Sequence, residues 1–191
     1  MKKFAGLFVM AFIFCLPAMA QDAPKDTSKY EVGGGFDFRS FSNFNGSRLS
    51  MVGWSAYGDR HIWRFINIAG DISGTYNRNA IFGNTSIYSF MGGPQLYPFG
   101  HQHKLTVFGQ LLFGGAAYLF HLPSQNGFNP VSTSYVGYAW MGGGGVDLRI
   151  KKRWAIRVIQ ADYEQTKLLS GAPSQGNYRV SIGLLYRFGI K

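Results

Sequence analysis

The chain has 191 residues, of which 17% are aromatic, 15% are charged and 26 are glycine. Its 19 basic residues outnumber its 9 acidic residues, but the basic residues are scattered, which argues against binding of nucleic acid. The aromatic content excludes a disordered chain, and the glycine content disfavours a helical one.

The first 20 residues are typical of a secretory signal peptide. Two early lysines precede an apolar run that is too short to span a bilayer, and Ala18 and Ala20 fit the small-residue cleavage pattern. We expect cleavage after Ala20, then a flexible periplasmic leader over 21–29 and one domain over 30–191. An uncleaved anchor helix is the alternative.

The only cysteine, Cys15, lies within this signal segment. Attachment of a lipid there would be an alternative, but the bulky Phe14 stands where small residues are usual. The mature chain would then contain no disulfide, so a secreted chain of this kind needs a large core or a closed sheet for stability.

Alternation of apolar with polar or small side chains dominates the rest of the chain, and a period of two indicates strands with opposite faces. The regular segments are 30–40, 66–76, 138–148 and 178–188, and the less regular ones are about 48–58, 86–97, 105–120 and 154–166. The total is eight strands, an even number. We therefore predict an all-β fold, an eight-stranded antiparallel up-and-down transmembrane β-barrel.

Two segments depart from simple alternation. In 154–166, Ile156 and Val158 share the apolar parity, but Asp162 would then fall on the same side. This break predicts a β-bulge near residue 159 or 160, which shifts the parity by one. Pro94 is difficult to place in a closed sheet and suggests a second bulge.

The connections alternate in length. The segments "DRHI", "FGHQHK" and "KKR" follow strands two, four and six, and longer segments rich in Asn, Ser and Gly follow the odd-numbered strands. Aromatic residues gather at both strand ends, as expected at the two interfaces of a bilayer. The short-turn set is Tyr57, Trp63, Tyr97, Phe99, Trp154, Tyr186 and Phe188, and the other set is Phe38, Phe41, Tyr76, Tyr118, Phe120, Tyr135, Tyr138 and Tyr178.

The segment "SIGLLYRF", residues 181–188, resembles the C-terminal insertion signal of OmpA-type small outer-membrane β-barrels. The matching residues are Ser181, Gly183, Tyr186 and Phe188. The departure is a tail of three residues after Phe188, where many family members end. The resemblance covers roughly residues 30–188 and implies a bacterial outer-membrane location and recognition by the insertion machinery. We expect no peptidoglycan-binding domain of the kind that longer relatives carry, because no chain remains to form it.

Physical constraints agree with this resemblance. A closed ring of strands satisfies the backbone within lipid, and eight strands enclose an interior that side chains can fill. A soluble barrel with an apolar lumen, as in the lipocalins, is the alternative. The aromatic belts, the end signal and the asymmetry of the connections favour the membrane barrel.

Acidic residues and arginines are interleaved on the polar parity, which predicts a structural ion-pair network in the lumen. Its expected members are Glu31, Asp37, Arg39, Asp71, Asp147, Arg149, Arg157, Arg179 and Arg187, with Asp162 or Glu164. The three-residue turn "KKR" pairs Asp147 with Arg157, and barrel closure brings Glu31 to Arg187. We expect both pairs to plug the lower lumen.

The predicted function is structural: an integral outer-membrane protein that anchors in the membrane and makes surface contacts, without enzymatic activity or cofactor. One alternative is a lipid A deacylase-like enzyme that uses His121 and Ser124, although the usual His-x-Ser spacing is absent. Another is a narrow pore.

His101 and His103 could ligate a metal, but two ligands are too few to predict a site. We expect a monomer whose partners are outer-membrane lipids and, during assembly, the insertion machinery. The partner of the external loops is unknown.

Overall fold

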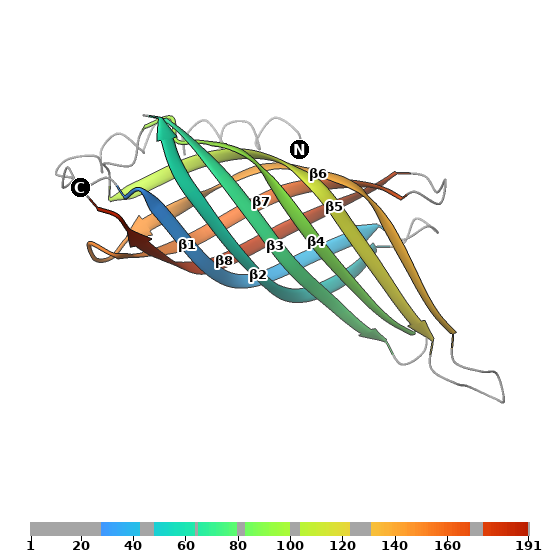
Figure 1. Ribbon diagram of the computed structural model, residues 1–191. Coiled ribbons are helices and arrows are strands. Elements are labelled where there is room, and N and C mark those ends of the chain that lie inside the picture. Colours follow the sequence, from blue (N-terminus) through green and yellow to red (C-terminus); the bar gives the residue numbers. More distant parts are fainter. Residues whose placement is uncertain are drawn as a thin grey trace, which may run out of the picture.

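The computed structural model describes residues 28–42, 48–63, 65–79, 83–99, 104–122, 131–168 and 174–190. Eight antiparallel strands form one closed barrel in simple chain order (Figure 1), which confirms the predicted fold class. The strands are β1 (Tyr30–Ser42), β2 (Arg48–Trp63), β3 (Ile66–Asn79), β4 (Gly83–Leu96), β5 (Leu105–Leu122), β6 (Val131–Arg149), β7 (Trp154–Leu168) and β8 (Gln175–Phe188). The predicted signal peptide and nearly all of the leader lie outside the described residues.

The barrel closes where the first strand pairs with the last. The β1–β8 register runs from Tyr30 opposite Phe188 to Ser40 opposite Tyr178. Just beyond β8, Gly189 has a φ of 67°, a left-handed conformation that glycine adopts without strain. The Lys29 amide donates to the carbonyls of Phe188 and Gly189, both at 3.2 Å, so the residue after the predicted end signal helps to seal the seam.

Several strands are longer than alternation predicted. The segment "DRHI", expected to be a turn, is the last part of β2, and the connection to β3 lies at residues 64–65. At the opposite end β3 and β4 run to Asn79 and from Gly83, which leaves only residues 80–82 between them. The connection after β4, expected to be short, is longer than this, because β4 ends at Leu96 and β5 begins at Leu105. The expected alternation of short and long connections is therefore wrong. Polar residues can continue a two-stranded ladder as well as form a loop.

One predicted bulge is present and the other is not. The β6–β7 register shifts between Val146 and Asp147, and both Val158 and Ile159 point outward, at 47% and 46% exposure. The β-bulge near residue 159 is therefore confirmed. At Pro94 the β4–β5 ladder is interrupted but resumes in the same register, so this residue marks no bulge. Its ring faces outward, and its missing N–H leaves only a local gap in the ladder.

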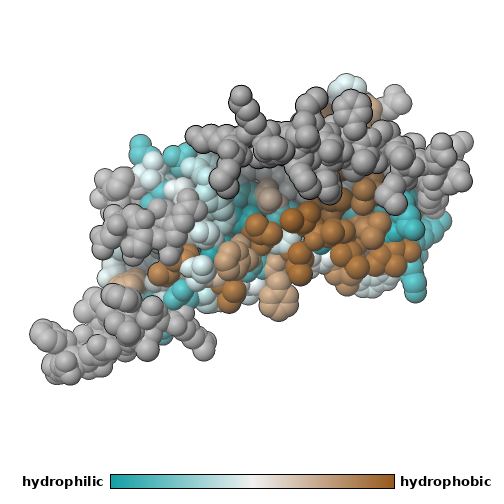
Figure 2. Space-filling view, turned by 180° about the vertical axis from the view of Figure 1, so that it is seen from behind, coloured by the Kyte–Doolittle hydropathy of each residue, from teal (hydrophilic) through white to brown (hydrophobic). Residues whose placement is uncertain are grey.

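The outer face of the barrel is apolar. Large side chains in the middle of the strands, such as Phe36, Ile72, Phe90 and Ile182, are between 45% and 78% exposed. Figure 2 shows apolar residues gathered across the middle of one face, with hydrophilic residues toward the ends. Within the described residues no helix is long and apolar enough to cross a membrane.

Aromatic rings form contacts from strand to strand near both ends. Toward the loop end, Tyr76 packs on Tyr88, and Tyr163 contacts both Trp140 and Tyr178. At the short-turn end we name one set the aromatic shelf: Tyr30 stacks on Phe188, Phe188 contacts Tyr186, and Tyr186 packs edge-on against Trp154. The shelf spans β1, β8 and β7.

Among the belt residues whose side chains are described, five lie on the inward side instead, and one of them, Tyr135, is the direct β6 neighbour of the buried Tyr118. Tyr97 and Tyr118 are buried, at 0% and 6% exposure, and Phe120 lies on the same strand face as Tyr118. Tyr57 lies on the inward parity of β2 and stacks on Arg157. The interpretation was wrong because position along a strand does not reveal which face a tyrosine occupies, and a tyrosine suits a lumen as well as an interface.

We expect the outer face to tolerate charge according to depth. An Ile182→Arg variant, in the middle of β8, should lose about 2–4 kcal/mol of stability in lipid, because the arginine would enter the hydrocarbon layer. Leu119→Arg, at an outward position near the loop end of β5, should lose about 1 kcal/mol or less. Urea unfolding in lipid vesicles measures both. Equal losses would contradict the assignment of this face to lipid.

Candidate functional site: the charged lumen

The lumen holds all the acidic side chains that the structure describes. Seven carboxylates and five arginines are buried there, with exposures of 9% or less. Alternation along the strands turns each of them inward, as the sequence indicated. They are Glu31, Asp37, Asp59, Asp71, Asp147, Asp162 and Glu164, with Arg39, Arg149, Arg157, Arg179 and Arg187. Both Asp162 and Glu164 face the lumen, because the bulge in β7 restores their parity.

The first expected ion pair lies at the short-turn end. Arg187 Nε is 2.9 Å from Glu31 Oε1, and the two residues are direct neighbours across the β1–β8 seam. The Ser28 hydroxyl donates to Glu31 Oε1 at 2.7 Å. Both charged side chains are nearly fully buried, so the pair lies inside the lower lumen beside the seam.

The second expected pair is two-pronged. Arg157 Nε lies 2.9 Å from Asp147 Oδ1, and its Nη2 donates to Oδ2 at 3.1 Å. The guanidinium lies between the rings of Tyr57 and Phe108, at 4.2 Å from each centroid. A two-pronged carboxylate contact and stacking on both faces suit arginine and would not suit lysine.

Two glycines make room for these rings. A Cβ at Gly33 would lie 2.3 Å from the Tyr57 ring, and a Cβ at Gly145 would lie 2.8 Å from the Phe108 ring. Each ring therefore lies over a stretch of the barrel wall where the inward-facing residue is a glycine and has no side chain. This explains part of the glycine content of β1 and β6, which alternation alone did not.

Arg179 is the centre of the network. Its Nη1 and Nη2 donate to the two carboxylate oxygens of Asp71 at 2.7 and 2.9 Å. Asp162 Oδ2 lies 3.0 Å away from Nη2, and Asp37 Oδ2 lies 3.5 Å from Nη1. One guanidinium thus joins carboxylates from β1, β3 and β7 across the full width of the lumen.

Glutamines connect this centre to the pair below it. Gln160 accepts from Arg157 Nη1 at 2.7 Å and donates to Asp162 at 2.7 Å. Gln110 donates to the other oxygen of Asp162 at 3.0 Å. A continuous chain of polar contacts therefore runs from Asp147 to Arg179.

The upper part of the network belongs to Arg39. Its Nη2 lies 3.0 Å from Glu164 Oε2 and donates to the hydroxyls of Ser73 and Ser89 at 3.2 and 3.3 Å. Arg39 and Glu164 are both fully buried.

The remaining predicted arginine, Arg149, is buried at the short-turn end of β6. Every arginine predicted for the lumen therefore lies in the lumen.

The sequence interpretation missed two parts of the lumen. Asp59, in the segment taken for a turn, accepts from Asn67 at 2.5 Å, and Asn67 also contacts His61 Nδ1. A cluster of apolar side chains lines the lumen over β2 to β6. It comprises Met51, Ala69, Ile87, Met91, Leu112, Ala116, Tyr118, Ala139 and Met141. The inward parity contained these residues, but an apolar side chain on a polar face carries no distinct signal.

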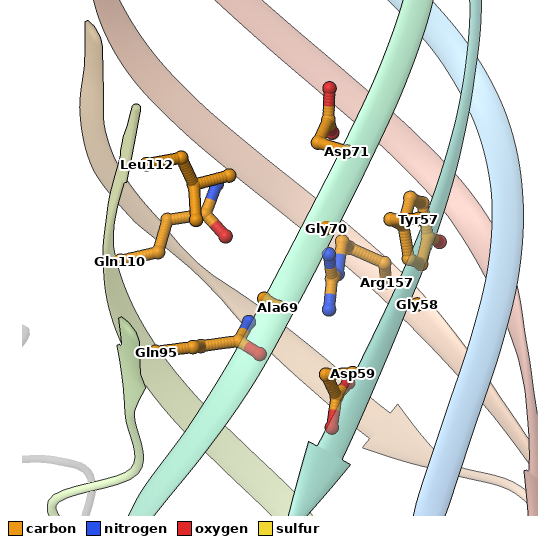
Figure 3. Close-up of a pocket in the computed structure, with 10 residues that line it drawn as sticks. All are labelled: Tyr57, Gly58, Asp59, Ala69, Gly70, Asp71, Gln95, Gln110, Leu112 and Arg157. Carbon is orange, nitrogen blue, oxygen red and sulfur yellow. The ribbon is translucent and has the colours of Figure 1, made fainter. Parts of the chain in front are cut away.

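Side chains fill the middle of the lumen almost completely. A cavity there has a volume of about 10 Å³, which is room for about one water molecule. In Figure 3, Gln95 and Gln110 reach it from one side, and Tyr57 and Arg157 from the other.

The other candidate sites find little support within the described residues. His121, at the loop end of β5, is exposed, and its Nδ1 lies 2.8 Å from the hydroxyl of Ser132 on β6. Its proposed partner Ser124 lies outside the described residues, as do His101 and His103. Among the residues that the structure describes, no group of three or more His, Cys, Asp or Glu could hold a metal ion.

The four residues of the expected insertion signal occupy both faces of β8. Ser181 is buried toward the lumen, and Phe188 is 38% exposed within the aromatic shelf. Gly183 shares the inward parity and Tyr186 the outward parity. Their recognition by the insertion machinery stays a prediction.

No protein-family model matches the chain, and no curated protein matches it in sequence. Solved structures do resemble it. Ail, the attachment invasion locus protein of Yersinia pestis, has 16% identity and a TM-score of 0.62, over 84% of this chain and 99% of Ail. Neisserial surface protein A has 14% identity and a TM-score of 0.61, over 84% and 98%.

OprG from Pseudomonas aeruginosa has 12% identity and a TM-score of 0.52, over 85% of this chain and 97% of OprG. These neighbours are small eight-stranded outer-membrane barrels. At such low identities the likeness shows the fold alone, and that fold is the one predicted.

The Asp147–Arg157 pair offers a direct test of the network. Removing one partner leaves an unpaired charge in a filled lumen, so Asp147→Ala should lose about 3–5 kcal/mol of stability. The double variant Asp147→Ala with Arg157→Ala should lose less than this, even though it also removes the guanidinium from between two rings. Urea unfolding of the folded barrel measures the free energies. A double variant at least as unstable as the sum of the two single variants would show that the charges are not coupled.

Proposed function

We propose that this protein is an integral outer-membrane barrel with a structural, membrane-anchoring and surface-contact role, without enzymatic activity. The observation that carries the proposal is the polarity of the barrel. Its outer face is apolar and ringed by aromatic side chains, and its lumen holds the charges. A soluble barrel around an apolar lumen would show the reverse arrangement. The fold shared with bacterial outer-membrane barrels supports the same location.

In this proposal the short-turn end faces the periplasm, and the end with the β1–β2, β3–β4, β5–β6 and β7–β8 connections faces outward. A signal peptide cleaved after Ala20 would deliver the chain. The names of two neighbours, an attachment invasion locus protein and a surface protein, are consistent with a role in surface contact. We propose such a role for the loop end, with a partner that is not identified.

The ion-pair network is the proposed plug. It fills the cross-section from Arg187 at the bottom to Arg39 at the top, with space for about one water molecule in the middle. A pore is therefore the weaker alternative. The enzyme alternative lacks a described acid beside His121, since every described carboxylate lies in the lumen.

A single comparison in cells tests location and chemistry together. The protein should fractionate with the outer membrane, resist carbonate extraction and migrate anomalously on gels unless it is heated. The lipid A profile of producing cells should equal that of cells lacking the protein. A His121→Ala variant serves as the control for any difference. A change in lipid A that disappears in this variant would favour the enzyme.

The end signal gives a further expectation. Phe188→Ala should lower the amount of folded protein in the outer membrane, because the family resemblance assigns Phe188 to recognition by the insertion machinery. Phe99→Ala is a matched control, since Phe99 is also an exposed phenylalanine at the short-turn end, at 60% exposure. Heat-dependent gel mobility measures the folded fraction. Equal losses in both variants would indicate a general interfacial effect and no specific signal.

A further inference from the structure

The described surface outside the lumen carries charge of one sign only. Of the 9 acidic residues, seven are buried in the lumen, and the other two, Asp22 and Asp26, precede the first described residue. Among the side chains that the structure describes, six exposed basic residues lie at the short-turn end and one, Lys167, lies at the loop end. The six are Lys29, Arg60, Lys104, Lys151, Lys152 and Arg153.

Two of these cations flank the aromatic shelf. Lys29 Nζ lies 5.5 Å from the centroid of the Tyr30 ring, and the Arg60 guanidinium lies 5.8 Å from the same centroid. Arg60 is the direct β2 neighbour of Tyr30, and Phe188 is its β8 neighbour on the other side. Charge and exposed ring surface therefore meet on three adjacent strands.

A third cation lies at the far end of the shelf. The Arg187 amide donates to the Arg153 carbonyl at 2.8 Å, which ties the β6–β7 turn to β8. Arg153 directly precedes Trp154, whose ring packs on Tyr186 at 5.0 Å between centroids. The shelf thus has exposed basic residues at both of its ends.

The charge and the apolar surface of this region are complementary to a ligand that is both anionic and amphipathic. Toward the middle of the barrel, the shelf continues into the apolar outer face through Val32 and Leu184, both 45% exposed. Nucleic acids and acidic proteins could satisfy the cations but would not cover this apolar surface. A phospholipid offers both parts: an anionic phosphodiester for Lys29 and Arg60, and acyl chains for the outer face. Aromatic rings are common at this headgroup level.

We propose that Lys29, Arg60 and the aromatic shelf form a binding site for a phosphatidylglycerol-type anionic phospholipid of the periplasmic leaflet. The inference rests on the proposed membrane placement. The lipid would lie on the outside of the barrel over β2, β1 and β8, with its phosphate near the Tyr30 ring and its chains along the seam. Such a lipid would hold the first and last strands together from outside, opposite the Glu31–Arg187 pair within.

Quenching of tryptophan fluorescence tests this site. The protein is purified from membranes with Trp154 as its only tryptophan, after Trp54→Phe, Trp63→Phe and Trp140→Phe. It is reconstituted in phosphatidylcholine vesicles that contain a small share of either phosphatidylglycerol or phosphatidylcholine brominated in the acyl chains. We expect brominated phosphatidylglycerol to quench Trp154 with roughly tenfold higher apparent affinity, because two cations attract its headgroup.

The test variant is Lys29→Gln with Arg60→Gln, and the control is Lys104→Gln with Lys167→Gln. Both remove two positive charges, but the control charges lie away from the shelf. The preference should disappear in the test variant, persist in the control, and persist with Arg60→Lys. A wild-type barrel that is inserted but shows no preference would overturn the site, and so would equal losses in both double variants. Failure of the wild type to insert, seen as absent heat-dependent mobility, would instead overturn the membrane placement.

Discussion

Closure of the barrel places two buried arginines side by side, and acidic residues in the lumen have to neutralise their charges. The β1–β8 register sets Arg39 directly opposite Arg179, and both are fully buried. Two adjacent guanidinium groups would repel each other strongly in a filled interior. Carboxylates from three strands surround them: Asp37 on β1, Asp71 on β3, and Asp162 and Glu164 on β7. Carboxylates supplied by β1, β3 and β7 therefore stabilise the arginines at the seam.

The need to neutralise Arg39 and Arg179 in the lumen explains several other features of the structure. The acidic residues are used inside, so the described outer surface is left apolar in the middle and basic at the short-turn end. The β7 bulge is needed because, without it, Asp162 and Glu164 would face outward, away from the arginines. The glutamines and the stacked rings of Tyr57 and Phe108 then occupy the space between the charged clusters. One network thus links strand register, the bulge and the closed lumen.

Alternation in the sequence predicted which face each charged residue occupies, and a hairpin count was enough to pair Asp147 with Arg157. It did not predict that Arg179 would reach Asp71, because contacts across the lumen depend on strand stagger, which a period of two does not contain. The wrong assignment of Tyr57, Tyr97 and Tyr118 has a different cause: they were assigned to the aromatic belts from their position along the strand, without regard to the face that they occupy. The apolar cluster in the lumen, which contains Met51, Met91 and Met141, was not predicted, because apolar residues at inward positions only make the alternation along a strand look irregular.

The central claim is that buried ion pairs close the lumen, and electrical recording in planar bilayers tests it most directly. The purified barrel should insert without producing steady current, because the network leaves space for about one water molecule at mid-height. Insertion can be verified independently by the heat-dependent gel mobility of protein reconstituted in vesicles of the same lipid. A stable, reproducible open-channel conductance from the inserted wild-type barrel would contradict the account.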